Sequence, residues 1–481
     1  MAPFPTGFRD DWAWWRDQAD IPVGTPFLIS PEFEYDVALN AFFCCASMVG
    51  SARTTQGGYA QDLAKFLTFL WTARGRRLWR DATEADHTAY LYWRRFDPAG
   101  PRIAARSWDR EVAAVNRFYG WQLRVGNVAV NPIPQRQRRA APIEASRGRW
   151  GAGDTPATYS HGAGRDKIEW FPASAYRRWR DIGMRGYQAD GLPDPRFRGR
   201  WAARNATFCD LMVRTGLRLS EQAALSVFDV PRERDVTGYR RFWLPAAIAK
   251  GGSARWIYVP ASVIADLVTY ATIDRADVVA AARAEGRYRR MRQPLVVADP
   301  DRPVVIVPHP GGGGHRVKVS HLDATERRRL LVDGPDGLAP AAFWLSENGL
   351  PVSTSTWKGL FAQANARCAA LGVDLHGHAH LLRHSFAVIT LEQLQRGHIA
   401  ALAELDPAQR GHYTRVFGDP LDWVRRRLGH RSVTTTMIYL HALAELEMET
   451  RMALVPDSWE HPGQIRPPER DHDSVAELDG V

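Results

Sequence analysis

The sequence predicts a mainly helical protein with small β-sheets, in which an N-terminal helical bundle precedes a larger mixed α/β domain. Apolar residues recur at helical spacing through residues 34–125, whereas proline and glycine interrupt that pattern between 131 and 166. Two alternating segments, 242–244 and 255–259, then indicate short strands among further helical stretches. A chain of 481 residues, 45% of them hydrophobic, is long enough for two or three domains with cores of their own.

Composition and charge divide the chain into five expected segments. Its 63 Lys and Arg exceed its 53 Asp and Glu, which gives a net charge of +10. Seven acidic residues and two arginines occupy positions 457–481, so the rest of the chain carries about +15. We expect an N-terminal arm, a helical domain, a basic linker, an α/β domain and a disordered acidic tail, at 1–33, 34–134, 135–167, 168–454 and 455–481.

The helical domain is expected to contain four helices, each with an apolar stripe facing inward. The first covers 34–48, and the second begins after a cap at Thr54 or Thr55 and ends before Gly75. The third follows the acidic segment 81–86, and the fourth covers 107–125. Each aromatic stripe is first of all a core feature, so no single Tyr or Trp here is assigned to a ligand.

The linker combines turn residues with arginines. Arg136, Arg138 and Arg139 lie among prolines and glycines that exclude a regular element. Arginines that neutralise phosphates release counterions, so this segment is a candidate contact with a nucleic acid backbone. A merely solvated basic linker is the alternative.

The α/β domain is expected to place several helices around one hairpin. Ser220 is the predicted N-cap of a helix at 221–226, and Lys250 lies at the hairpin tip. Residues 262–341 contain a predicted helix at 276–292, strand character at 295–307 and a four-glycine loop that lacks the Gly-Lys-Ser/Thr of a phosphate loop. The remaining predictions are helices at 174–182, 202–214, 355–371, 380–394 and 422–428, a strand at 343–352, and a final helix capped by Thr434 or Thr435.

Cysteine usage and hydropathy point to an intracellular protein. The four cysteines form no C-x-x-C pair, and we expect reduced, mostly buried thiols in a cytoplasmic protein. The N-terminus does not resemble a signal peptide, and no segment is apolar enough for a membrane helix.

The residues between 377 and 441 carry the chemistry. Segment 380–384 reads His-Leu-Leu-Arg-His, 428–430 reads Leu-Gly-His, and Tyr439 lies on a predicted helix shortly after. His380 and Arg383 are three residues apart, so they share a helix face and can approach one phosphate. A phenol becomes a usable nucleophile where nearby cations stabilise its anion, which makes Tyr439 the candidate nucleophile.

These motifs resemble the C-terminal signature of the tyrosine recombinases, or phage integrase family. The signature comprises an early Arg, a Lys in a β-turn, a His-x-x-Arg box, a His after Leu-Gly, and a Tyr nine residues later. The matching residues, in order, are Arg218, Lys250, His380, Arg383, His430 and Tyr439. The resemblance covers about 34–450, and it includes the helical segment, which is similar to the family's core-binding, DNA-binding domain. Residues 262–341 exceed the family's spacing and are predicted to be an insertion.

The resemblance implies a site-specific recombinase or integrase of a mobile element that closes as a clamp on double-stranded DNA. Tyr439 would form a 3′-phosphotyrosyl intermediate, with His380 as a base and Glu221 orienting Arg218 or a histidine. Arg218, Arg383 and His430 would hold the phosphate, and Lys250 would protonate the 5′-oxygen. The reaction would need no metal, ATP or other cofactor. Four protomers would assemble on two DNA sites, exchange contacts through 442–453, and use an accessory DNA-bending or directionality factor.

Three alternatives remain open at this point. The chain could be a non-catalytic accessory DNA-binding protein, or a topoisomerase of type IB that uses the same chemistry without strand exchange. His380 and His384 also have the spacing of a zinc-binding helix, with His376 and His378 nearby. However, Leu381 replaces the Glu of a metalloprotease box, and Arg383 would repel a metal ion.

Overall fold

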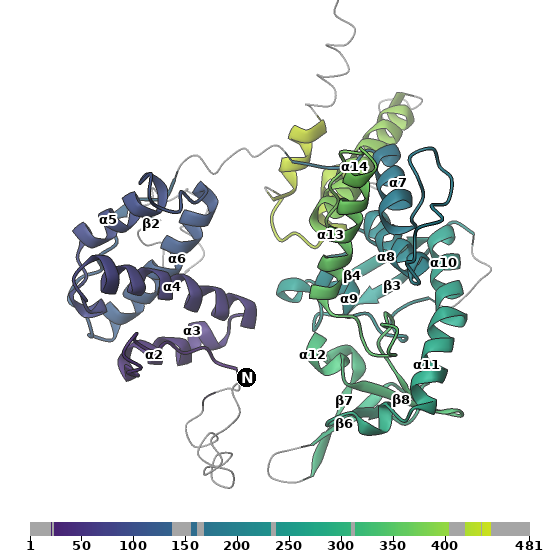
Figure 1. Ribbon diagram of the computed structural model, residues 1–481, viewed down its shortest axis with the longest axis horizontal. Coiled ribbons are helices and arrows are strands. Elements are labelled where there is room, and N and C mark those ends of the chain that lie inside the picture. The colour runs from purple at the N-terminus through teal and green to yellow at the C-terminus, as the bar shows by residue number, and fades with distance from the viewer. Residues whose placement is uncertain are drawn as a thin grey trace, which may run out of the picture. The chain divides into compact units, whose positions relative to one another are not determined.

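A computed structural model describes residues 21, 24–136, 155–160, 168–231, 237–308, 313–403, 419–433 and 435–443. The side chains of 308 and 398–403 are not among the described ones. The chain divides into two compact units, Met1–Asp166 and Lys167–Val481 (Figure 1). Arg138, Arg139, Thr434, most of the arm, loop 309–312 and the acidic tail lie outside the described residues.

Unit 1 is a small helical bundle. Its elements are α2 (Val37–Cys44), α3 (Ala46–Val49), α4 (Arg53–Ala73), η1 (Trp79–Asp81), α5 (Glu84–Arg95) and α6 (Ala105–Arg124). The helix expected at 34–48 is broken, because Cys45 has the extended values φ −68° and ψ 150° between α2 and α3. The cap predicted at Thr54 or Thr55 is wrong, since both residues lie inside α4 and Ala52 precedes it without a side-chain bond.

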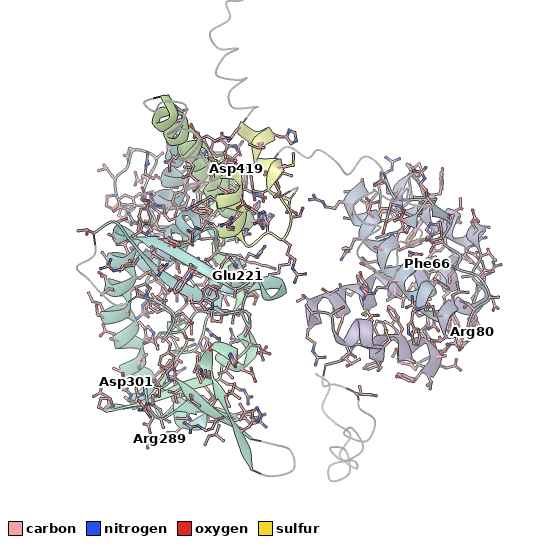
Figure 2. The ribbon with its side chains drawn as sticks, turned by 180° about the vertical axis from the view of Figure 1, so that it is seen from behind. Phe66, Arg80, Glu221, Arg289, Asp301 and Asp419 are labelled. Atoms are coloured by element: carbon pink, nitrogen blue, oxygen red, sulfur yellow. The ribbon has the colours of Figure 1, made fainter. Side chains whose placement is uncertain are left out.

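The core of unit 1 is aromatic and surrounds a buried ion network. Phe66, labelled in Figure 2, is fully buried and meets Tyr90 edge-on. Glu111, 1% exposed, accepts hydrogen bonds from Arg94, Tyr90 and Lys65. The apolar side of each helix faces this aromatic core, so the bundle is stabilised mainly by the burial of apolar area and not by helix propensity.

Two short strands lie in the segment that the sequence analysis expected to be irregular. β1 (Gln135–Arg136) pairs antiparallel with β2 (Thr155–Pro156), so two parts of the proline- and glycine-rich segment lie side by side. Thr158, next to β2, bonds the buried His87, and its carbonyl accepts from the Trp108 indole. Residues 155–160 of this segment therefore pack against the core of unit 1.

Unit 2 is a mixed α/β structure, as the sequence predicted. Its helices include α7 (Ala173–Trp179), which continues as the π-helical η2 (Arg180–Met184), α8 (Ala202–Thr215), α9 (Leu219–Ala223), α13 (Thr354–Ala370), α14 (Ala379–Ala403), α16 (Pro420–Leu428) and helical residues 435–443. β3 (Tyr239–Leu244) and β4 (Arg255–Pro260) form the predicted hairpin, joined through η3 (Lys250–Gly252). The strand predicted at 343–352 is wrong, because only isolated bridges form there, such as Leu345 with Pro351.

Helix α10 (Ala261–Thr272) packs into the main core of unit 2, and the described residues from 274 to 340 that follow it fold as an annex at one end of the unit (Figure 1). The annex contains α11 (Asp274–Ala284), η4 (Tyr288–Arg290), η5 (Val319–His321) and α12 (Ala324–Arg327). β5 (Leu295–Val297) pairs parallel with β8 (Leu330–Gly334), which pairs antiparallel with β9 (Gly337–Pro340). β6 (Val304–Pro308) and β7 (Gly314–Lys318) form a separate hairpin. The single helix predicted at 276–292 and the single strand at 295–307 each correspond to two elements.

Two further observations bear on the predictions. Cys209 and Cys368 are buried free thiols, but Cys44 is exposed and Cys45 is half-buried, so the prediction of buried cysteines is wrong for Cys44. Among the described residues, no helix is both long and apolar enough to cross a membrane.

Candidate active site

Helix α14 carries three of the candidate side chains on one face. His380, Arg383 and His384 are spaced at i, i+3 and i+4, and the rings of the two histidines lie 4.2 Å apart, edge to face. The approach to α14 is tightly packed, because a Cβ on Gly377 would lie 2.3 Å from the Trp179 ring. The start of the helix is thereby fixed against the main core of unit 2.

Arg383 is the central cation of the site. Its guanidinium, 2% exposed as a residue, donates to the carbonyl of Gly216 and, over 2.6 Å, to the carbonyl of Leu428. Its Nη2 also lies 3.3 Å from His430 Nε2. Burial and the charge of Arg218 lower the pKa of Arg383 to about 9, so it is still protonated at neutral pH. One planar fork thus joins the end of α8 to the turn after α16.

Glycine is required at both carbonyl-bearing turns. Gly216 ends α8 at φ +66°, and a Cβ there would lie 2.4 Å from the Phe386 ring. Gly429 ends α16 at φ +64°, where a Cβ would lie 2.9 Å from Ser253 Oγ and 3.1 Å from Arg255 Nη1. Both turns need the left-handed conformation and a close approach, which only glycine provides without strain.

Glu221 is a fully buried carboxylate beside Arg218. Its Oε1 accepts from Arg218 Nη1 over 2.9 Å, and its Oε2 accepts from the Arg218 backbone N–H over 3.0 Å. Helix α9 therefore begins at Leu219 with Arg218 at its N-cap, and the predicted cap at Ser220 is wrong. Burial raises the pKa of Glu221, but Arg255 and Arg218 outweigh it and lower that pKa to about 2.

Tyr439 is held inside unit 2. Its side chain packs with Phe386, Leu391, Val424 and other apolar residues, and the residue is 1% exposed. The hydroxyl lies 2.9 Å from His384 Nδ1, so its partner is His384 and not His380, the base expected from the sequence. Burial raises the pKa of Tyr439 to about 12, although Arg383 and Arg218 act in the opposite direction.

The histidines of the site are kept neutral. Burial and the charge of nearby groups, Arg383 among them, lower the pKa of His430 to about 4 and that of His384 to about 3. The pKa of His380 is lowered by the same two causes. His430 Nδ1 is 3.0 Å from Thr436 Oγ1, which fixes the ring while its Nε2 faces Arg383. Because these histidines carry no charge, the net positive charge of the site comes from the cations beside them.

Lys250 lies at the start of η3, in the connection between β3 and β4, and its side chain is exposed. Its backbone N–H donates to Glu221 Oε1 over 3.2 Å, so the hairpin tip is anchored to the same carboxylate as Arg218. Arg431, just after Leu-Gly-His, donates to the carbonyl of Gly251. These bonds place the exposed ammonium at the edge of the cluster.

The structure thus gathers all six sequence-predicted catalytic residues around the α14 face in unit 2, whereas Arg136 belongs to unit 1, where it is exposed on β1. Sequence reasoning missed two participants, Arg255 and Thr436. The burial pattern of β4 places Arg255 on the same face as Ile257 and Val259, and the period-two alternation of that strand could have identified it as an inward arginine. Nothing in the sequence singles out Thr436.

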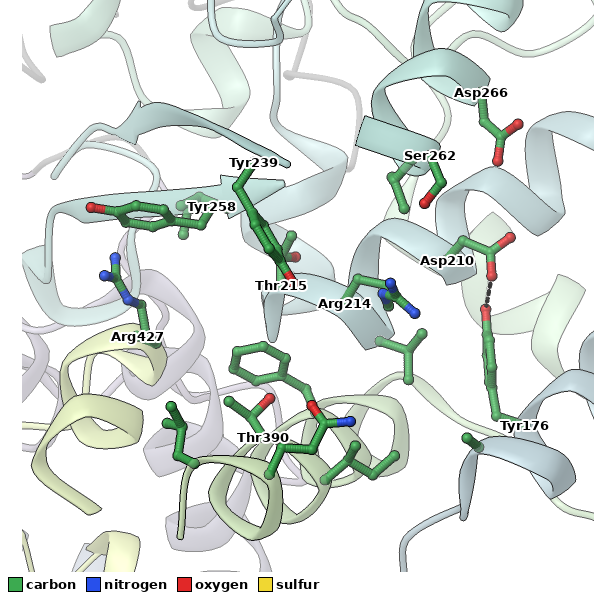
Figure 3. Close-up of a pocket in the computed structure, with 18 of the residues that line it drawn as sticks. Tyr176, Asp210, Arg214, Thr215, Tyr239, Tyr258, Ser262, Asp266, Thr390 and Arg427 are labelled. Carbon is green, nitrogen blue, oxygen red and sulfur yellow. Dashed lines mark hydrogen bonds between the residues drawn. The ribbon is translucent and has the colours of Figure 1, made fainter. Parts of the chain in front are cut away.

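One large cavity of unit 2 is not this site. It has a volume of about 1000 Å³ and is lined on α14 by Ile389, Thr390 and Gln393, on the side of the helix away from His380 and His384 (Figure 3). Tyr176 donates to Asp210 within it over 2.8 Å. The candidate active site does not coincide with this cavity, and the described residues contain no group of three or more His, Cys, Asp or Glu able to hold a metal ion.

Comparison with known proteins gives matches among solved structures alone. No family model and no curated protein matches the chain. The XerH site-specific recombinase bound to a difH substrate matches with a TM-score of 0.46 and 14% identity, over 87% of this chain and 85% of that one. The Tn1549 transposon integrase with a circular intermediate DNA gives 0.47 and 12%, over 86% and 99%. A lambda integrase dimer on a core site gives 0.42 and 13%, over 84% and 93%. These three solved structures, which the chain resembles, are those of site-specific recombinases and integrases.

Proposed function

We propose that this chain is a tyrosine recombinase that cleaves and rejoins double-stranded DNA through Tyr439. One observation carries the proposal: Arg218, Arg383, His430 and the Tyr439 phenol, drawn from four separate segments, converge in one positively charged cluster. Each residue alone has an ordinary structural explanation. Their convergence, with Lys250 at the edge, supports phosphoryl transfer, since this chemistry needs cations around two non-bridging oxygens.

In the proposed reaction the Tyr439 oxygen attacks the phosphorus, and the 5′-oxygen leaves. Arg218 and Arg383 stabilise the charge that grows on the non-bridging oxygens, and His430 donates to one of them. The phenol proton passes to the histidine in contact with it, His384, which replaces His380 as the proposed acceptor. A bound phosphate adds negative charge, which raises the pKa of the histidines and makes them better acceptors.

Lys250 supplies the proton that the 5′-oxygen needs on leaving. The 3′-phosphotyrosyl bond conserves the energy of the broken diester, so a 5′-hydroxyl can reseal it without ATP. Because Tyr439 is 1% exposed, its side chain must shift toward the surface before it can reach a phosphate. We propose duplex DNA as the partner and four protomers on two sites as the working assembly.

A covalent-adduct assay tests the proposal. The purified chain is incubated in EDTA with tiled, nicked duplexes from the DNA that flanks its gene, then separated in SDS. Wild type is expected to form a stable adduct on the fragment that contains its site, and Tyr439→Phe none. Tyr176→Phe is the matched control, since it also removes one buried phenol that donates a single hydrogen bond.

The outcomes separate the proposal from its rivals. An adduct that persists in Tyr439→Phe would refute the assignment of the nucleophile. Binding to every fragment without an adduct would favour an accessory DNA-binding protein. A protein that forms the adduct and relaxes supercoiled DNA but exchanges no strands would be a topoisomerase, and an adduct that forms only when EDTA is left out would favour a metal site.

A further inference from the structure

Arg255 is a buried arginine that the proposed reaction does not use. It is the first residue of β4 and is 6% exposed. Its Nη2 donates to Glu221 Oε2 over 2.6 Å, and its Nη1 lies 3.3 Å from Oε1. The two residues are 34 positions apart in the chain, so this bidentate pair is a tertiary contact of unit 2.

The carboxylate that Arg255 binds has no remaining acceptor capacity. Glu221 Oε1 accepts from Arg218, Lys250 and Arg255, and Oε2 accepts from the Arg218 backbone and Arg255. A carboxylate offers about four lone-pair sites, and all are used. Arg218 is consequently bound through one terminal nitrogen, Nη1, while Arg255 takes the bidentate position.

Arg255 also reaches the turn that carries His430. Its Nε donates to the carbonyl of Arg427 over 2.8 Å, just before Leu-Gly-His. Gly429 approaches its guanidinium so closely that a Cβ would lie 3.1 Å from Nη1. One guanidinium therefore connects the Glu221 carboxylate to the backbone that presents His430.

We propose that Arg255 is a positioning residue that keeps Arg218 available to the phosphate. The inference rests on the proposed function, because it takes Arg218 to be a phosphate ligand. Glu221 with Arg218 alone would be electrically neutral, and the two would form the bidentate pair that Arg255 now prevents. With Arg255 in place the trio carries a net charge of +1, and Arg218 keeps part of its fork for the substrate.

The test compares single-turnover adduct formation by four variants. Arg255→Met is expected to slow the reaction about 100-fold, the size of effect seen when one transition-state donor is lost. Arg255→Lys keeps the charge but not the planar guanidinium, and its adduct formation is expected to be about tenfold slower than that of wild type. The rate of Glu221→Gln alone is measured as well, so that the effect of Arg255→Met can be compared in the presence and in the absence of the Glu221 carboxylate. Glu221→Gln with Arg255→Met is expected to recover about tenfold over Arg255→Met, because a neutral amide no longer holds the charge of Arg218.

Arg327→Met is the matched control. Arg327 is 2% exposed and is paired with Asp229 over 2.7 Å in the same unit, so it reports the cost of removing a buried arginine. Thermal unfolding of each variant is measured alongside. Equal adduct rates for Arg255→Met and Arg327→Met, or a double variant no faster than Arg255→Met, would overturn the proposal, since a purely structural role predicts no recovery.

A crystal structure of Arg255→Met keeps the inference testable apart from the reaction. Arg218 is expected to rotate into a bidentate pair with Glu221, and an unchanged Arg218 would refute the positioning role. If wild type formed no adduct at all, the proposed function would fail, while the position of Arg218 in this variant would still decide the inference.

Discussion

The charge of Glu221 is expected to make the stability of unit 2 depend on pH in the acid range. The pKa of this carboxyl falls from its ordinary value of 4.5 to about 2 in the folded chain, where burial is outweighed by Arg255 and Arg218. A shift of this size corresponds to about 3 kcal/mol. Since the folded pKa is the lower one, this stabilisation is fully present above pH 4.5 and is lost as the pH falls toward 2.

The comparison of wild type with Glu221→Gln isolates this effect. At pH 7 the variant leaves Arg218 and Arg255 without their anion, so it is expected to be less stable by about 3 kcal/mol. Protonated Glu221 resembles Gln, so the gap should narrow between pH 4.5 and 2. Urea unfolding at several pH values measures the gap, and hydrogen exchange of β4 amides assigns it to unit 2. The other acidic groups are the same in both proteins, so their effects on the free energy of unfolding cancel in the difference. A difference that stays constant from pH 6 to pH 2.5 would therefore refute the assignment of this effect to Glu221.

Three further variants are expected to behave as follows. Gly429→Ala should destabilise unit 2 by at least about 1 kcal/mol and disturb His430, because φ at this position is +64° and the new Cβ would meet Ser253. Thermal unfolding measures the loss, with Gly359→Ala as the control, since a Cβ there meets nothing within 4 Å. Lys250→Ala should slow cleavage of ordinary DNA about 100-fold. Cleavage of a duplex with sulfur in place of the bridging 5′-oxygen should keep its rate, because a thiolate leaves without a proton. Equal slowing on both substrates would contradict the role of Lys250. Asp86→Asn should cost unit 1 about 3 kcal/mol in urea unfolding, because Arg74 and Arg77 lose a buried partner with a pKa of about 2, whereas the exposed Asp81→Asn should cost little.

Much of the helical architecture was predictable because its causes are local. The third and fourth predicted helices correspond to α5 and α6, with a Thr83–Asp86 capping box at the start of α5. The hairpin around Lys250 followed from alternation and two glycines, and η3 contains Gly251 at φ +67°. Such patterns depend on neighbours a few residues apart, which the sequence displays directly.

The annex was poorly predicted because its pairing is not local. β5 pairs with β8 across more than thirty residues, and their parallel register leaves no turn signal between them. Outside the annex, helix α10 escaped detection, and Phe343 and Trp344 were predicted as part of a strand although they lie in the main core with Trp357. Burial in the tertiary structure overrode local preference at these positions.

The sequence by itself determined the helical bundle, the hairpin and the identity and order of the six candidate residues, because residue type and spacing along the chain carry that information. The tertiary structure alone decided which atoms meet. It placed His384 instead of His380 against Tyr439, buried the phenol, and joined Arg383 to the carbonyl of Gly216, 167 residues away. It also brought Arg255 to Glu221, which no periodicity encodes, since hydrogen bonds between distant segments depend on how the helices pack and not on the residues next to each partner.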